Sequence, residues 1–109
     1  MLSLTEAAKP LFYSDIPTEA ADAAFASICK FQSLKSLNYF PQFIESEITV
    51  PKLYLLCERD QAIPPAFQEV MVQVGKLDKV VRLESGHSPF LSIPHKVVEA
   101  IVDFSNQIS

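Results

Sequence analysis

The sequence predicts an α/β fold in which two parallel strands alternate with two helices. The first sign is the uninterrupted apolar run from Leu53 to Cys57, because a strand without alternation is typical of a parallel sheet covered on both faces. The second is "KVVRLE", residues 79–84, which indicates another short strand. The third is a helical pattern after each strand, "PPAFQEVMVQVG" and "IPHKVVEAIVDFSNQI". This order predicts a right-handed crossover between two parallel neighbours.

Both helices of this βαβα unit carry apolar residues at helical spacing. Gly75 ends the first helix and Pro94 begins the second, as is usual for glycine and proline at helix ends. The two apolar stripes comprise Phe67, Val70, Met71 and Val74, and Val97, Ile101, Phe104 and Ile108. Two parallel strands are not a sheet that is stable alone. We therefore expect neighbours that these 109 residues do not obviously supply.

The first half of the chain is interpreted as helices and proline-marked connections. "DIPTEAADAAFASIC", starting at residue 15, combines a proline, a capping candidate at Thr18 and early acidic residues, which are helix-start signals. Apolar residues at positions 21, 24, 25 and 28 give this helix a small stripe. "FQSLKSLNYFPQFIES", residues 31–46, is rich in aromatic residues without a clear period and predicts a short helix and an irregular linker.

Length and composition indicate one domain. With 109 residues, 49% of them apolar and 20% charged, the chain has room for one core and is neither disordered nor a coiled coil. No apolar stretch reaches the roughly 20 residues of a membrane-spanning helix. The first residues lack the basic region and long apolar run of a secretory signal, so we expect a cytoplasmic protein. Cys29 and Cys57 form no CxxC pair and no disulfide framework, and are interpreted as buried free thiols.

Charge and glycine content exclude two classes of binding protein. The net charge is −4 and the nine lysines and arginines are dispersed, which argues against nucleic acid and anionic membranes as partners. Gly75 and Gly86 are the only glycines, so glycine-rich phosphate cradles such as GxGxxG and the Walker loop are absent from the sequence.

Two polar residues follow the predicted strands, at the edge where ligands collect in parallel sheets. Asp60 lies three residues past Cys57, and His87 lies three past Glu84. Because neighbouring parallel strands are about 5 Å apart, loops that leave the same edge can bring a carboxylate and an imidazole into contact. Such an acid fixes the tautomer of the ring and leaves the other nitrogen free to act as a base. The pair suggests the orienting acid and the general base of a nucleophilic relay.

A simpler interpretation of both residues stays open on position and type alone. A histidine in a loop is more often structural or on the surface than catalytic. Asp60 could simply cap the turn before Pro64 and Pro65, because aspartate favours turns.

The second half of the chain resembles the end of an α/β-hydrolase. "KLYLLCERDQAIPPAFQEVMV" followed by "KVVRLESGHSPFLSIPHKVVEAIVDF" is similar to the plant methyl esterases and hydroxynitrile lyases and to their fungal and bacterial relatives. In that family the triad acid follows the penultimate strand and the histidine follows the last one. The resemblance therefore implies Asp60 as acid and His87 as base. It covers residues 48–108, and residues 10–37 are similar to the helical cap of the group.

The resemblance implies a partial α/β-hydrolase fold with two parts. Residues 1–47 correspond to a helical cap remnant and linker, and residues 48–109 to the C-terminal βαβα portion of the core. It also implies carboxylic-ester hydrolysis as the ancestral chemistry, with no metal and no organic cofactor. Ser88 follows the histidine where the cyanohydrin-cleaving branch has a lysine, so an ester or a related acyl substrate fits better.

The sequence departs from the family at the nucleophile. The family places its serine in a GxSxG elbow upstream of the cap, and builds its oxyanion hole from backbone amides of the same region. No GxSxG occurs in these 109 residues. Five other serines are poor substitutes, because they either flank the histidine and point away from it or lie near the cap without a strained turn: Ser85, Ser88, Ser14, Ser33 and Ser36. We therefore expect the 109 residues to be inactive alone.

Other polar and aromatic residues carry weaker expectations. His95 lies in the first turn of the last helix without ligands at metal spacing, and is expected to be solvated. The aromatic residues of the first half could line an acyl pocket beneath the cap, but such residues are more often ordinary core: Phe12, Tyr13, Phe25, Phe31, Tyr39, Phe40 and Phe43.

Two functional hypotheses from different classes remain. In the first, the chain is the C-terminal part of an α/β-hydrolase and carries its cap, acid and base. In the second, it is a non-catalytic binding or regulatory module derived from a hydrolase, which pairs its exposed sheet edge with a complementary chain. An in-frame GxSxG within about 150 residues upstream in the coding DNA would favour the first. A stable, soluble protein without such a segment would favour the second.

Overall fold

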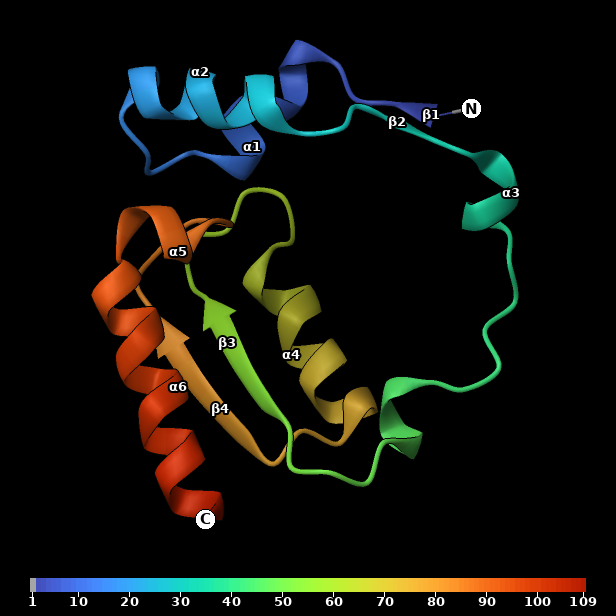
Figure 1. Cartoon of the computed structure of the whole chain (residues 1–109), viewed down its shortest axis with the longest axis vertical. Helices are drawn as coiled ribbons and strands as arrows, with labels where there is room; N and C mark the ends of the chain where they lie inside the picture. Colours follow the sequence, from blue (N-terminus) through green and yellow to red (C-terminus); the bar gives the residue numbers. More distant parts are fainter. Residues whose placement is uncertain (1) are drawn as a thin grey trace.

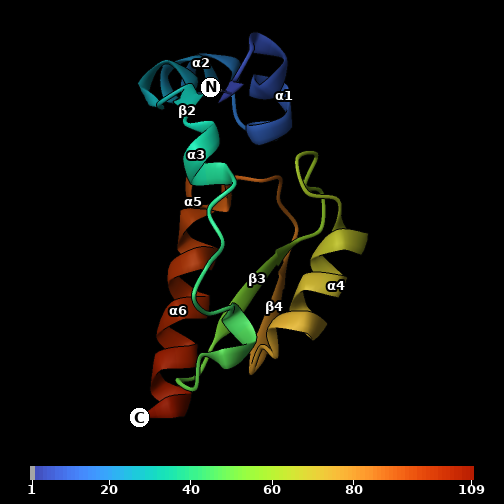
Figure 2. The same cartoon turned by 90° about the vertical axis from the view of Figure 1, so that its right-hand side faces the viewer.

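The computed structural model describes residues 2–109, and its second half is a parallel two-stranded sheet between two helices (Figure 1). The elements of this unit are β3 (Leu53–Cys57), α4 (Pro65–Gly75), β4 (Lys79–Leu83), α5 (Pro89–Ser92) and α6 (Pro94–Ile108). The strands pair in parallel, from Leu53 opposite Lys79 to Cys57 opposite Leu83. Helix α4 lies on one face of the sheet and α6 on the other (Figure 2). The predicted order of strand, helix, strand and helix is confirmed, with the short α5 as an addition.

Strand β3 is the centre of this unit. Leu56 is fully buried and Cys57 is buried, whereas the three residues before them are half-buried. Within the described residues, β3 pairs with β4 alone, so its other edge has no strand beside it. An apolar strand with one paired edge is only partly covered, as the sequence led us to expect.

Helix α4 turns its apolar stripe away from the strands. Phe67 and Val70 are 65% and 57% exposed, and Met71 and Val74 are also exposed. The buried residues of the helix are Gln68 and Gly75. Periodicity identified the stripe correctly, but the opposite side of the helix, which carries a polar residue, meets the strand end.

The end of α4 differs from the usual glycine cap. Gly75 is the last helical residue, and Lys76 after it takes the left-handed conformation, with φ 54°. A Cβ at Gly75 would lie 2.8 Å from Cδ2 of Leu77 and 3.1 Å from Cγ of Glu45, so both side chains would have to shift to admit it. The helix end is thus pressed against the linker that precedes β3.

The first half forms a small helical layer beyond the carboxyl ends of β3 and β4 (Figure 1). Its elements are β1 (Leu2–Ser3), η1 (Glu6–Ala8), α1 (Lys9–Phe12), α2 (Thr18–Ser27) and β2 (Phe31–Gln32). The linker that follows contains α3 (Leu34–Leu37) and η2 (Glu45–Glu47), and it returns along the side of the molecule to the start of β3 (Figure 1). A core of its own joins Tyr13 and Ile16 to Ala21 and Phe25 of α2. Thr18 is the first helical residue rather than the cap, and no side chain caps this helix.

The chain is more open than a closed domain of its size. Its radius of gyration is 15.7 Å, against about 13 Å for a compact domain of 100 residues. Its accessible surface is 7743 Å², against about 6,000 Å² for a folded monomer of this mass. The excess includes the outer face of α4 and the aromatic residues of the linker between β2 and β3.

Leu56→Ala tests the centre of the fold against its periphery. Removing a fully buried leucine side chain should lower the free energy of unfolding by about 2–5 kcal/mol. Val70→Ala, on the exposed stripe of α4, should change it by no more than about 0.5 kcal/mol. Urea unfolding followed by circular dichroism measures both, and equal losses would show that the stripe of α4 is packed.

Candidate functional site

The parallel ladder of β3 and β4 continues into the two loops that follow the strands. Backbone N–H of Glu58 donates to Leu83 O at 2.9 Å, and N–H of Arg59 donates to Ser85 O at 2.9 Å. The loops therefore run side by side to within one residue of Asp60 and two of His87. This pairing brings two residues that are 27 positions apart to the same edge of the sheet.

Asp60 and His87 form a hydrogen bond, with 2.9 Å between Oδ2 of the acid and Nδ1 of the ring. The Asp60 side chain is 4% exposed and the His87 side chain 34% exposed. An ionised carboxylate can only accept, so the pairing holds the hydrogen on Nδ1 and leaves Nε2 as an acceptor. Within residues 2–109 the ring makes no other hydrogen bond. The arrangement can orient the imidazole and offer Nε2 to a proton donor.

The second oxygen of Asp60 caps the turn that follows it. Oδ1 accepts the backbone N–H groups of Ala62 at 2.8 Å and Ile63 at 2.9 Å. The sequence left open whether Asp60 caps a turn or contacts His87, and the structure shows both contacts. Oδ1 caps the turn and Oδ2 bonds to His87. A carboxylate fixed by its own turn cannot rotate away from the ring without losing both backbone bonds.

The helical layer forms hydrogen bonds with the residues on both sides of His87. N–H of Gly86 donates to Oδ2 of Asp15 at 2.8 Å, and Oγ of Ser88 donates to Phe12 O at 2.9 Å. The Phe12 ring stacks on the imidazole, with 5.4 Å between ring centroids and 28° between the planes. The imidazole of His87 is therefore held by Asp60 from one side and by the first half of the chain from another.

Gly86 permits this approach. A Cβ at this position would lie 2.7 Å from both Oδ1 of Asp15 and Oγ of Ser14. Sequence reasoning missed the roles of Phe12 and Asp15, because contacts across more than 70 residues leave no local pattern. The scarcity of glycine was the available signal, since an isolated glycine often marks a close backbone approach.

The serines of the chain do not contact the free nitrogen of the ring. Ser85 is fully buried with Oγ directed at Gly86 O, and Ser88 is engaged with Phe12. Ser33 Oγ accepts from N–H of Lys35, and Ser36 Oγ donates to Ser33 O. Both hydrogen bonds lie at α3, which Ser33 caps. Ser14 Oγ lies beside Gly86. Among residues 2–109, the hydrogen bond of the His87 ring goes to Asp60 and not to a serine, and the expectation that none of these serines is the nucleophile stays a prediction.

The two cysteines differ in environment. Cys29 is exposed, so its interpretation as a buried thiol is wrong: it follows the end of α2, where the chain leaves the small helical core. Cys57 is buried at the end of β3. Burial raises the pKa of the Cys57 thiol, and the neighbouring Ser85 hydroxyl partly offsets this. Desolvation also raises the pKa of the Tyr54 phenol on the same strand.

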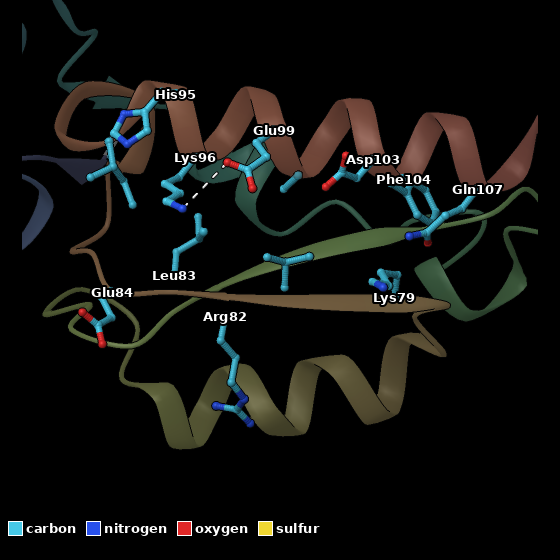
Figure 3. A pocket seen from close by; sticks show the side chains of 13 residues that line it. Lys79, Arg82, Leu83, Glu84, His95, Lys96, Glu99, Asp103, Phe104 and Gln107 are labelled. Atoms are coloured by element: carbon cyan, nitrogen blue, oxygen red, sulfur yellow. Dashed lines mark ion pairs between the residues drawn. The ribbon is translucent and has the colours of Figure 1, made fainter.

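A hollow of about 530 Å³ lies elsewhere, between β4 and α6 (Figure 3). Its lining includes Leu83, Lys96 and Glu99, and the last two form an ion pair at 3.8 Å. Arg82 points away from it towards α4, where it pairs with Glu69. Neither Asp60 nor His87 lines this hollow. His95 borders it from the first turn of α6 and is exposed, as expected.

The aromatic residues of the first half do not form one pocket. Tyr13 and Phe25 belong to the core of the helical layer, and Phe12 lies on His87. The remaining members are exposed: Phe31, Tyr39, Phe40 and Phe43. Of this set only Phe12 borders the candidate site.

Two further findings concern the described part of the chain. Among residues 2–109, no three His, Cys, Asp or Glu side chains come together as metal ligands could. Over the same range, no helix has both the length and the apolar character to cross a membrane.

Comparisons of sequence place this geometry among known proteins. A model of the alpha/beta hydrolase family matches residues 2–100. The alpha/beta hydrolase nvfD of Aspergillus novofumigatus is 32% identical over 103 residues, which are 92% of this chain and 40% of that protein. A probable hydrolase R7 of a Phoma species is 32% identical over 63 residues, 53% of this chain and 26% of that protein. The chain thus spans 40% or less of the length of these relatives.

Solved structures resemble the fold. The crystal structure of polyneuridine aldehyde esterase matches with a TM-score of 0.63 at 20% identity, over 90% of this chain and 40% of that one. A histidine-to-alanine mutant of the same esterase matches with a TM-score of 0.67 at 20% identity, over 94% of this chain and 42% of that one.

Gly86→Ala tests the contact between the His87 loop and the helical layer. The added methyl meets Asp15 and Ser14, so the free energy of unfolding should fall by about 1–3 kcal/mol. Asp15→Ala removes one of the clashing groups. The double variant should therefore lose at least about 0.5 kcal/mol less than the sum of the single losses. Additive losses in urea unfolding would mean that the two segments do not meet.

The thiol of Cys57 should be unreactive in the native chain. The thiolate is the reactive form, and both burial and the raised pKa of Cys57 disfavour it. In the Cys29→Ser variant, an aromatic disulfide reagent at neutral pH should label Cys57 slowly in buffer and rapidly in urea. In Cys57→Ser, exposed Cys29 should react at similar rates in both. Rapid labelling of Cys57 in buffer would contradict the packing of the strand end.

Proposed function

The chain belongs to the alpha/beta hydrolase family, and we propose that Asp60 and His87 are the acid and the base of a serine-type acyl hydrolase. The observation that carries the proposal is the 2.9 Å hydrogen bond between Oδ2 of Asp60 and Nδ1 of His87, with Nε2 left as an acceptor. A partly exposed ring on a buried acid is what a general base requires, because one nitrogen must stay accessible while the other is fixed.

In the proposed reaction, His87 Nε2 takes the proton of a serine hydroxyl as its oxygen attacks the carbonyl carbon of an ester. The C–O bond to the alcohol then breaks, and the imidazolium returns the proton to the departing alkoxide. Water, deprotonated by the same nitrogen, hydrolyses the acyl-serine and regenerates both groups. Asp60 stays ionised throughout and stabilises the imidazolium. An ester rather than a cyanohydrin substrate is supported by Ser88 after the histidine.

The proposal divides the chain by role. Residues 1–47 act as cap and linker, and residues 48–109 as the C-terminal part of the hydrolase core. The bonds from Asp15 and Phe12 to the residues flanking His87 support this division, since they set the cap directly over the base. Phe12, stacked on the imidazole, would then border the acyl group.

A separate segment must supply the nucleophile in this proposal, because no GxSxG occurs among the 109 residues. We place its docking surface at the free edge of β3 and the exposed stripe of α4. Within residues 2–109 this edge pairs with no strand, and the apolar stripe of α4 is exposed. The segment would be the remaining part of an alpha/beta hydrolase, on the same chain or on a complementary one.

A non-catalytic binding module would use the same free edge and stripe. The hydrogen bonds of Asp60 favour catalysis. One of its oxygens caps a turn while the other orients the imidazole of His87. A module that binds only along the free edge of β3 has no need of an oriented, half-exposed histidine at the carboxyl ends of the strands.

A chimaera tests the proposal. In it, this chain replaces the matching 40% of the Aspergillus novofumigatus hydrolase, and the remaining part of that protein would supply the serine elbow and the oxyanion hole of the family. The chimaera should hydrolyse p-nitrophenyl acetate. His87→Ala should lower kcat about 10⁴-fold or more, and Asp60→Asn about 10⁴-fold, since each breaks the relay.

The isolated 109 residues and a chimaera without the elbow serine are the controls, and neither should hydrolyse the ester or react with a fluorophosphonate. His95→Ala, on an exposed histidine outside the site, should leave kcat unchanged. A folded chimaera whose hydrolysis survives His87→Ala would refute the assignment.

A further inference from the structure

Gln68 is a buried polar residue to which the proposed mechanism gives no role. It lies in α4, one turn beyond the proline that opens the helix, and is 2% exposed. A glutamine carries two donors and an acceptor, which must find partners when the side chain is buried. Its partners are therefore informative about why it is there.

The Gln68 amide binds the two ends of the loop that carries Asp60. Oε1 accepts N–H of Cys57 at 2.9 Å, and Nε2 donates to Cys57 O at 3.0 Å, so both backbone groups at the end of β3 are held. Nε2 also donates to Ile63 O at 2.7 Å, on the far side of the acid. One side chain thus closes the span from residue 57 to residue 63.

The same span fixes the carboxylate. Ile63, whose carbonyl accepts from Gln68, gives its N–H to Oδ1 of Asp60, while Oδ2 holds His87. A continuous path of hydrogen bonds therefore runs from α4 through the loop to the imidazole. A second, longer route runs through Asp60 itself, whose N–H donates to Cys57 O at 3.4 Å and whose Oδ1 accepts from Ala62 and Ile63. Gln68 is the side chain that joins residue 63 to residue 57 directly.

We propose that Gln68 is a positioning residue for the relay, which sets the loop of Asp60 and through it the tautomer and orientation of His87. This rests on the proposed function only for its consequence in catalysis. The geometric part of the proposal is that the tautomer and orientation of His87 depend on Gln68. This part can be tested without any catalytic activity. Gln68 does not touch the ring or a substrate, so its effect should reach the reaction through kcat and not through KM.

Nitrogen-15 NMR of the histidine ring tests the geometric part in the 109-residue chain. At about pH 8 a neutral imidazole reports its tautomer through the shifts of its two nitrogens. The wild-type chain should show His87 with its hydrogen on Nδ1. Gln68→Met, of similar length but without donors or an acceptor, should shift His87 towards a mixture with the Nε2–H form. Asp60→Asn, which removes the partner itself, is the positive control.

Val72→Ala separates positioning from stability. Val72 lies one turn further along α4, is half-buried, and makes no side-chain hydrogen bond. This variant should weaken the fold yet keep the wild-type tautomer. Should Gln68→Met fail to fold, Gln68→Glu gives the same readout, because it keeps the acceptor for Cys57 N–H and loses both donors. A folded Gln68 variant with the wild-type His87 spectrum would overturn the proposal.

The catalytic consequence is measured in the chimaera. Gln68→Met should lower kcat for p-nitrophenyl acetate about 10- to 100-fold with KM unchanged, because a displaced base costs turnover and not binding. Val72→Ala should leave kcat near the unsubstituted value. The tautomer of His87 could depend on Gln68 while hydrolysis by the chimaera does not depend on His87. That result would mean that the positioning role is right and the proposed function wrong. An unchanged kcat in Gln68→Met, with hydrolysis dependent on His87, would refute the positioning role alone.

Discussion

Parallel pairing of β3 with β4 is the constraint on which the site depends. Because the strands run in the same direction, in register up to Cys57 and Leu83, the loops after them leave one edge side by side. The pairing continues through Arg59 and Ser85, so the backbone has little freedom before it reaches Asp60 and His87. An antiparallel pair would have sent these loops to opposite ends of the sheet. The contact between acid and imidazole is thus a consequence of topology first and of side-chain chemistry second.

Each partner of that contact is held by more than the contact itself. The carboxylate is fixed by backbone N–H groups of its own turn, and the histidine by hydrogen bonds on both sides of it and by the ring of Phe12. Preorganisation of this kind matters for catalysis, because a base already in place spends no free energy on finding its orientation. It also makes the helical layer part of the candidate site, since the loop of His87 contacts both Asp60 and residues 12 and 15 of that layer.

Much of this arrangement could be predicted from the sequence, and the failures have physical reasons. The apolar run from Leu53 predicted β3, and residue type with strand-end position singled out Asp60 and His87. Periodicity gave the stripe of α4 but not the side that meets the sheet, because both a polar amide and an apolar stripe can be buried once enough partners exist. The contacts of Phe12 and Asp15 join segments more than 70 residues apart, and no local pattern records such contacts. The catalytic roles themselves stay predictions.

The most direct test of the account is a crystal structure of the chimaera after reaction with a fluorophosphonate. We expect Oδ2 of Asp60 within hydrogen-bond distance of Nδ1 of His87, and Nε2 about 2.6–3.2 Å from the oxygen of the modified serine or from one water bound to it. A carboxylate turned to solvent, or an imidazole whose Nε2 faces away from the serine, would contradict the account.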